Sequence, residues 1–121
     1  MKVLVLGASG MLGHMLVKVL SETEKVTGTV RGDYSAIGKN ELPAGVIKPG
    51  VDVTDSEVVK SVLDEFQPDA VVNCAGIIKQ RHANAEWSIR VNSLFPHILA
   101  DMISERNIRL INISTDCVFS G

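Results

Sequence analysis

Gly7, Gly10 and Gly13 have the spacing of a phosphate-binding turn. They follow the apolar run Val3–Leu6 and precede an amphipathic stretch, so they fall between a predicted strand and a predicted helix. Glycine tolerates the positive φ of such a turn and lets a diphosphate or a neighbouring element approach the backbone. The amides that open the helix then offer donors and a partial positive charge. The sequence therefore predicts a site for the diphosphate of a dinucleotide.

The same turn has a plainer interpretation, because glycines also allow a helix to pack closely on a strand. Its position after the first strand of a predicted β-α-β unit favours nucleotide binding. No lysine follows Gly13, which excludes a P-loop. The residues of the turn predicted to line the cofactor are Gly7, Ser9, Gly10, Met11, Leu12 and Gly13.

Composition restricts the class of protein. A chain of 121 residues with 45% hydrophobic and 21% charged residues suits one globular domain. The formal net charge of −2 gives no basic surplus for nucleic acid or an anionic membrane. No apolar run is long enough to span a bilayer. Cys74, Cys117 and the three histidines lack disulfide or metal-ligand spacing, so we expect no metal and reduced, buried thiols in a cytoplasmic protein.

Strand and helix patterns alternate along the chain. The predicted strands are Val3–Leu6, Val26–Val30, a short one near Val46-Ile47, Asp69–Asn73 and Arg109–Ile113. Helices are predicted from Met11, after Thr54-Asp55-Ser56-Glu57, and over about 84–106. This alternation predicts an α/β fold, a parallel sheet covered by helices on both faces.

The details of the helices can also be predicted. The residues expected to form the buried stripe of the first helix are Met11, Leu12, Met15, Leu16, Val19 and Leu20. In the second helix, the Thr54 hydroxyl and Glu57 are expected to form a capping box. Pro96 lies inside the apolar stripe of the long helix and is expected to kink it, because it removes one intrahelical bond.

Further motifs point to a known family. They are Asp52-Val53-Thr54-Asp55, Asn73-Cys74-Ala75-Gly76 and, at positions 114–121, S-T-D-C-V-F-S-G. Together with the glycine turn, which is G-x-x-G-x-x-G, they resemble the extended branch of the short-chain dehydrogenase/reductase superfamily. The last motif is similar to the S-T-D-x-V-F-x-G stretch of dTDP-4-dehydrorhamnose reductases and related sugar-nucleotide reductases. The resemblance spans the whole chain and implies a Rossmann-type, doubly wound sheet with strand order 3-2-1-4-5.

The resemblance also implies roles for individual residues. Asp52 would meet the adenine amino group with Val53 beside the ring, although their motif could equally be a helix cap. Small residues after the fourth strand would let the cofactor ribose lie close, or could merely end that strand. These residues are Cys74, Ala75 and Gly76. Asn92 matches a position where the family often has asparagine, and a solvated side chain is the alternative.

Arg31 bears on the choice of cofactor. It follows the second predicted strand, where an enzyme that prefers NAD would carry an acidic residue for the ribose hydroxyls. An arginine suits the 2′-phosphate of NADP, because its fork binds phosphate with two hydrogen bonds. A surface arginine is the alternative, and Asp33 could reverse the preference. The sequence favours NADP, with NAD possible.

Catalysis in the family needs residues that this sequence lacks. Thr115 matches the residue that hydrogen-bonds the substrate carbonyl. The proton-donating tyrosine and the lysine four residues later have no counterpart, since the sole tyrosine, Tyr34, lies near the second strand. An apolar last strand would also be left as an exposed edge. Residues 1–121 are therefore interpreted as the cofactor-binding front of a longer enzyme, ending before the Tyr/Lys helix and inactive alone.

These observations favour an NADP(H)-dependent reductase of a keto-sugar nucleotide, of the kind used in polysaccharide biosynthesis. One alternative is a sugar-nucleotide epimerase or dehydratase, in which NAD stays bound. Another is a nucleotide-binding regulatory subunit without catalysis. The extended family pairs subunits through the helix near 84–106, so the resemblance also implies a homodimer.

Overall fold

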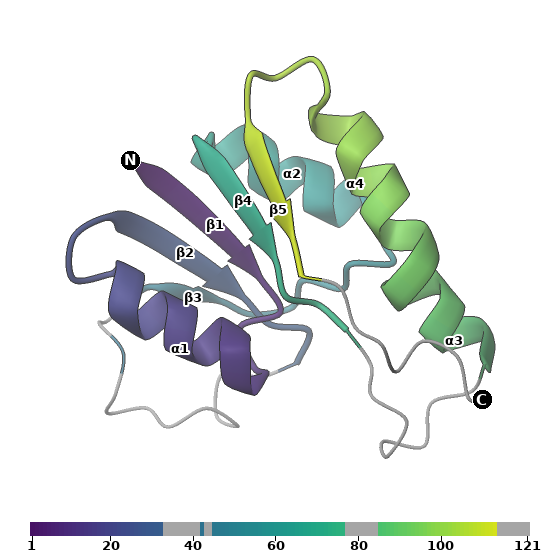
Figure 1. Ribbon diagram of the computed structural model, residues 1–121, viewed down its shortest axis with the longest axis horizontal. Coiled ribbons are helices and arrows are strands. Elements are labelled where there is room, and N and C mark those ends of the chain that lie inside the picture. The colour runs from purple at the N-terminus through teal and green to yellow at the C-terminus, as the bar shows by residue number, and fades with distance from the viewer. Residues whose placement is uncertain (33–41, 43–44, 77–84, 114–121) are drawn as a thin grey trace.

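The computed structural model describes residues 1–32, 42, 45–76 and 85–113. Its five-stranded parallel sheet consists of β1 (Lys2–Leu6), β2 (Lys25–Thr29), β3 (Ile47–Lys48), β4 (Ala70–Asn73) and β5 (Arg109–Asn112). The strand order is β3-β2-β1-β4-β5 (Figure 1). This order confirms the predicted doubly wound, Rossmann-type fold.

The sheet has helices on both faces. The described helices are α1 (Met11–Leu20), α2 (Ser56–Phe66), α3 (Ala85–Ile89), the π-helical turn η2 (Arg90–Leu94) and α4 (Phe95–Ile103). α1 covers one face, and α2 and α4 cover the other (Figure 1). None of the described helices has the length and hydropathy needed to cross a membrane.

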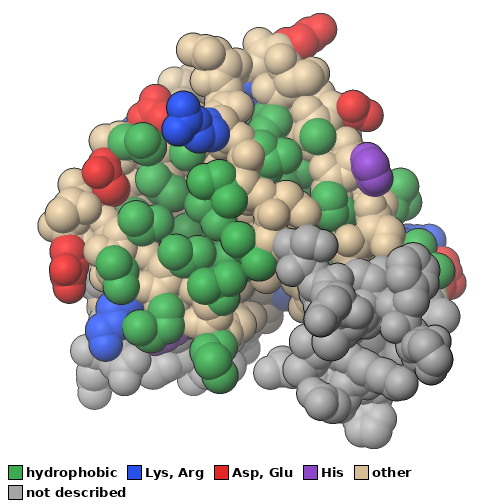
Figure 2. Space-filling model, viewed as in Figure 1, with side chains coloured by type: hydrophobic (Ala, Val, Ile, Leu, Met, Phe, Trp, Pro, Cys, Tyr) green, Lys and Arg blue, Asp and Glu red, His purple; other side chains and the backbone are tan. Residues whose placement is uncertain are grey.

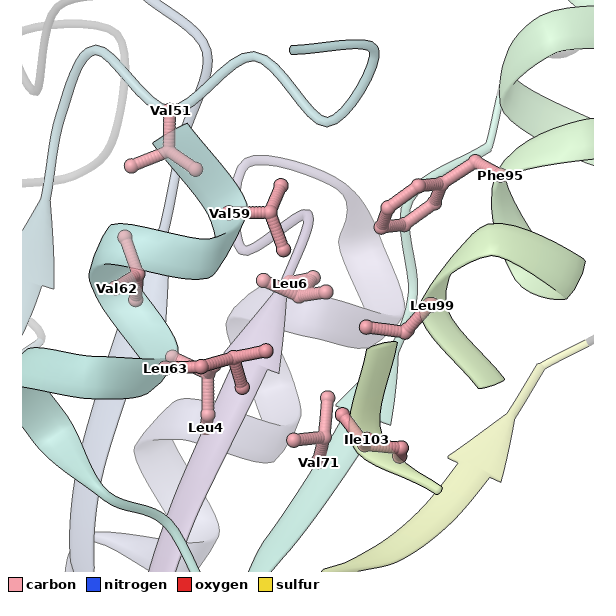
Figure 3. Packing of buried hydrophobic residues seen from close by; sticks show 10 residues of the cluster. All are labelled: Leu4, Leu6, Val51, Val59, Val62, Leu63, Val71, Phe95, Leu99 and Ile103. Atoms are coloured by element: carbon pink, nitrogen blue, oxygen red, sulfur yellow. The ribbon is translucent and has the colours of Figure 1, made fainter. Parts of the chain in front are cut away.

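Alternation along β1 divides the core between the two faces. Val3 and Val5 pack with Val17 of α1. Leu4 and Leu6 point the other way, because side chains alternate along a strand, and join a cluster contributed mainly by α2, β4 and α4 (Figure 3). A strand that is apolar on both faces is what a central position in a parallel sheet requires.

The buried face of α1 differs from the prediction. Gly13 and Val17 are buried, with Leu16 and Leu20 partly buried, whereas Met11 is 89% exposed. The other residues of the expected stripe that are exposed are Leu12, Met15 and Val19. The reason is the close approach at Gly13, which turns the Gly13–Val17 side of the helix toward the sheet. Hydrophobic side chains consequently gather on this face of the molecule (Figure 2).

The predicted capping box at α2 is wrong. Asp55 is the N-cap, and its carboxylate accepts from the amides of Glu57 and Val58 at 3.1 and 3.3 Å. The Thr54 hydroxyl instead donates to Oδ1 of Asp52 at 2.7 Å. Aspartate is an N-cap as good as threonine, and a carboxylate also complements the positive end of the helix. The Thr54 hydroxyl is therefore free of the capping role and fixes the carboxylate of Asp52.

The long helix predicted near 84–106 is interrupted by a π-helical turn rather than kinked only at Pro96. The amide of Phe95 donates to the carbonyl of Arg90, five residues back. Pro96 then lies in the first turn of α4, directly after the π-helical turn, and the first turn is the part of a helix that tolerates proline best. The wider turn takes up one extra residue, and Val91 and Phe95 are both buried.

Thr29 offers a test of polar burial in the sheet. Its side chain is 1% exposed. In the described part of the chain, its hydroxyl oxygen is the one buried side-chain polar atom that has no hydrogen-bond partner. An unpaired buried hydroxyl costs about 1–3 kcal/mol. Thr29→Val, which keeps the shape, is therefore expected to raise the free energy of unfolding of the intact protein by about 1 kcal/mol in urea denaturation. A loss of stability would show that the hydroxyl has a partner.

Candidate nucleotide-binding site

Gly7 joins the ends of three strands. It has φ +80°, and a Cβ there would lie 2.6 Å from the amide nitrogen of Ala75. The next residue, Ala8, donates its amide to the carbonyl of Thr29 at 2.8 Å. The turn after β1 is therefore held between the ends of β2 and β4, and position 7 has room only for glycine.

Gly13 and Gly10 have different surroundings. A Cβ at Gly13 would overlap the carbonyl oxygen of Gly7, so this glycine allows α1 to pack against the turn. Among the described residues, a Cβ at Gly10 would meet only that same oxygen, at 3.7 Å. The first and third glycines thus serve close packing, whereas the second borders open space.

The start of α1 is an uncapped helix N-terminus. Gly10 is the N-cap, no side chain caps the helix, and its first turn has no acidic residue. The first intrahelical bond runs from His14 to Gly10 at 2.9 Å. The amides of Met11, Leu12 and Gly13 precede it and have no acceptor within the helix. Donors at a positive helix end, beside space left by a glycine, suit the diphosphate of a dinucleotide.

Arg31 and Asp52 meet beyond the end of β2. A backbone hydrogen bond of 2.9 Å from Val51 to Val30 brings their segments together. Nε of Arg31 lies 3.9 Å from Oδ2 of Asp52, and the guanidinium carbon lies 4.6 Å from the ring centroid of Trp87. Both charged side chains are partly exposed, so this ion pair alone adds little stability.

The carboxylate of Asp52 has defined partners. Its Oδ1 accepts from the amide and the hydroxyl of Thr54, at 3.0 and 2.7 Å. This arrangement directs Oδ2 toward Arg31. Val53 is partly buried and packs against the core between the sheet, α2 and α4. The roles expected for Asp52 and Val53 at the adenine remain predictions.

Asn73 orders the loop after β4. This buried side chain accepts from the amide of Ala75 at 3.1 Å and donates to Oδ1 of Asn112 on β5 at 2.7 Å. A Cβ on Gly76 would lie 3.4 Å from Oδ1 of Asn92, which brings η2 to the same loop. The structure therefore brings the loop at Cys74–Gly76 and Asn92 together beside Gly7.

The sequence-based site omitted two residues. Sequence reasoning gives Asn73 no role beyond its place in a motif and assigns no role to Trp87. The signal for Asn73 is that a polar residue ends an otherwise apolar strand. A second asparagine, Asn112, stands near the end of the next strand. Nothing in the sequence pattern indicated that Trp87 would contact Arg31.

Burial raises the pKa of the Cys74 thiol. This side chain is partly buried against the core beneath α1, where the thiolate is poorly solvated, so the prediction of a buried thiol is partly right. Because the thiolate is the reacting form, alkylation of Cys74 by iodoacetamide is expected to be slower than that of a free thiol near pH 8, with its pH midpoint displaced upward. A Cys117→Ser background isolates the reaction. A midpoint at or below that of a free thiol would contradict the effect of burial.

Several predicted features lie outside the described residues, namely Thr115, Asp33, Tyr34, Cys117 and the motif at 114–121. Within the described ranges, no group of three His, Cys, Asp or Glu side chains is arranged to hold a metal. A cleft of about 640 Å³ lies at the opposite, amino edge of the sheet, lined in part by Asp69 and Arg109. It is remote from the glycine turn because it borders the starts of β4 and β5.

Comparison with known proteins agrees with this geometry. The model of the family described as the RmlD substrate binding domain matches residues 1–121. The chain is 35% identical over 120 residues to the dTDP-4-keto-6-deoxy-D-glucose reductase of Streptomyces niveus, covering 98% of this chain and 36% of the relative. It is 30% identical over 125 residues to the methionine adenosyltransferase 2 subunit beta of Danio rerio, covering 99% of this chain and 34% of the relative.

Among solved structures, the fold resembles Bordetella bronchiseptica WbmG in complex with NAD, with a TM-score of 0.74 and 22% sequence identity. The match covers 93% of this chain and 36% of that one. This likeness confirms the Rossmann-type fold. The chain spans about a third of the length of the curated relatives that it matches.

Proposed function

We propose a function on the premise that the chain belongs to the family of the RmlD substrate binding domain. The chain is the cofactor-binding part of an NADP(H)-dependent reductase that acts on a keto-sugar nucleotide. The observation that carries this proposal is the glycine turn, in which Gly7 and Gly13 have no room for a side chain while Gly10 borders open space. Uncapped amides beside that space, at the carboxyl edge of a parallel sheet, are suited to a dinucleotide.

The cofactor would be held by residues at this edge. The amides of Met11, Leu12 and Gly13 would donate to the diphosphate. The other residues that would line the cofactor are Gly7, Ser9, Gly10, Arg31, Asp52, Val53, Cys74, Ala75, Gly76 and Asn92. The bound cofactor supplies a hydride, and Thr115 would hydrogen-bond the substrate carbonyl and orient it.

Arg31 supports NADP over NAD in this proposal. Its guanidinium is partly exposed beyond the end of β2, and a planar fork of donors fits a phosphate better than a ribose hydroxyl. WbmG, by contrast, is described with NAD. Binding of NADP and NAD measured side by side decides between them.

The rest of the enzyme is also part of the proposal. Residues 1–121 would form the front of a longer protein whose further part supplies the proton donor. A homodimer would form through the segment α3–α4, on which Ile89 and Leu94 are exposed. The free thiol of Cys74 is compatible with the cytoplasm.

The experiment is to mix the intact protein with NADPH and a dTDP-4-keto-6-deoxy sugar and to follow the absorbance of the reduced nicotinamide. The similarity to the reductase of Streptomyces niveus motivates this substrate. We expect stoichiometric consumption of NADPH with formation of the hydroxy sugar. An epimerase or dehydratase would convert the sugar nucleotide without net consumption, and that result would overturn the proposal.

A second candidate is a nucleotide-binding regulatory subunit. It is favoured by the similarity to a protein named as a subunit of methionine adenosyltransferase. This candidate predicts that the intact protein binds NADP(H) but does not reduce a keto-sugar nucleotide. It also predicts a stable complex with a catalytic partner, which size-exclusion chromatography of the mixed proteins would detect.

A further inference from the structure

Arg31 is held from two sides by residues of other segments. The guanidinium carbon lies over the ring of the Trp87 indole, 4.6 Å from the ring centroid. Its edge faces Asp52, with Nε 3.9 Å from Oδ2. Trp87 belongs to α3 and Asp52 to the segment before α2, so both contacts are made by tertiary structure.

Among the described residues, the ion pair of Arg31 uses only Nε of the guanidinium, and the cation–π contact with Trp87 takes up no hydrogen of the group. The two terminal nitrogens form the fork that binds a phosphate. Thr54 fixes the carboxylate of Asp52 with two hydrogen bonds, so the partner at Nε is itself held in place. An arginine with 69% side-chain exposure would otherwise sample many rotamers.

We propose that Trp87 is a positioning residue for Arg31 and thereby sets the preference of the site for a dinucleotide with a 2′-phosphate. By stacking on the guanidinium, Trp87 reduces the side-chain entropy that Arg31 loses when it binds phosphate. The inference rests on the proposed function, because it assigns the group that Arg31 recognises. NAD lacks this phosphate, so its affinity does not depend on the stacking.

The experiment measures the dissociation constants of NADP and NAD separately for the intact protein and its variants. Trp87→Leu is expected to weaken NADP binding by about two- to fivefold, because that ratio corresponds to the free energy of an exposed cation–π contact. The affinity for NAD is expected to stay the same. Trp87→Phe keeps an aromatic face and is expected to restore most of the NADP affinity. Val19→Ala, at an exposed apolar position near the end of α1, is the control and is expected to change neither constant.

A second set of variants, made in an Arg31→Leu protein, distinguishes positioning of Arg31 by Trp87 from a direct contact of Trp87 with NADP. In an Arg31→Leu protein, Trp87→Leu is expected to have no further effect on NADP affinity, because its action passes through the guanidinium. Equal weakening of NADP and NAD by Trp87→Leu, or full additivity with Arg31→Leu, would overturn the inference. If Arg31→Leu changes the NADP preference but Trp87→Leu does not, the inference fails while the proposed function stands. If the unmodified protein binds neither dinucleotide, the proposed function itself fails.

Discussion

Replacing Gly13 by alanine is expected to destabilise the protein by about 3 kcal/mol or more, near the upper end for overpacked sites. The added methyl group would overlap the carbonyl oxygen of Gly7, and both atoms are held by backbone that cannot move without separating α1 from the sheet. Gly7 cannot shift away easily, because its own Cβ position is only 2.6 Å from the backbone of Ala75. Urea denaturation of the intact protein measures the loss.

Gly10→Ala is the matched control for this substitution. Position 10 has φ −76°, which any residue adopts, and the nearest atom to an added Cβ is 3.7 Å away. Its effect on the free energy of unfolding is therefore expected to stay within about 1 kcal/mol, because alanine is a poorer N-cap than glycine but also restricts the unfolded chain more. Equal losses at positions 10 and 13 would mean that α1 does not pack on the glycine turn as described.

Phe95→Ala is expected to lower the free energy of unfolding by about 3–5 kcal/mol, the usual range for removing a buried aromatic ring. The ring is 2% exposed and packs in the cluster that joins β1 and α2 to α4 (Figure 3). It also begins α4 directly after the π-helical turn, so the cavity would lie where α4 meets the sheet. Thermal and urea unfolding of the intact protein both report the change.

An exposed apolar residue on α1 gives the control for Phe95. Val19 is 56% exposed, and Val19→Ala removes apolar atoms from the surface. Its effect is expected to be within about 0.5 kcal/mol. If the two alanine variants were equally stable, the π-helical turn would not direct Phe95 into the core.

The order of elements and the sheet followed from sequence because their signals are local. β1 and β4 carry continuous apolar runs, and the alternation of strands with helices leaves few topologies for a parallel sheet. The glycine turn was also predictable, because Gly7, Gly10 and Gly13 stand between two strongly patterned segments. The boundaries of the strands shifted by about one residue, as expected for ends set by hydrogen bonding rather than by side-chain type.

Helix faces and caps were harder to predict because they depend on tertiary contacts. Hydrophobic residues occur on more than one side of α1, and the contact of Gly13 with the turn determines which side is buried. Thr54 and Asp55 are both good caps, and Thr54 is engaged by Asp52, which a pattern of neighbours does not reveal. Pro96 predicted an irregular helix, but the position of the π-helical turn follows from burying Val91 and Phe95 together.

The candidate site was predictable where its residues belong to sequence motifs. Gly7, the loop at Cys74–Gly76 and Asn92 are close together at the carboxyl edge, as the resemblance implied. The contact of Arg31 with Trp87 joins segments more than fifty residues apart, and no spacing rule relates them. Long-range pairing of this kind has to be seen in the fold.

Calorimetric titration of NADPH into the intact protein and its Gly10→Ala variant tests the central claim most directly, namely that the amides opening α1 bind the linked phosphates. We predict saturable binding of one NADPH per chain by the unmodified protein, and at least about tenfold weaker binding, or about 1.4 kcal/mol, by the variant at unchanged stability. Equal affinity in the two proteins, or no binding of NADPH or NADH by the unmodified one, would contradict the claim.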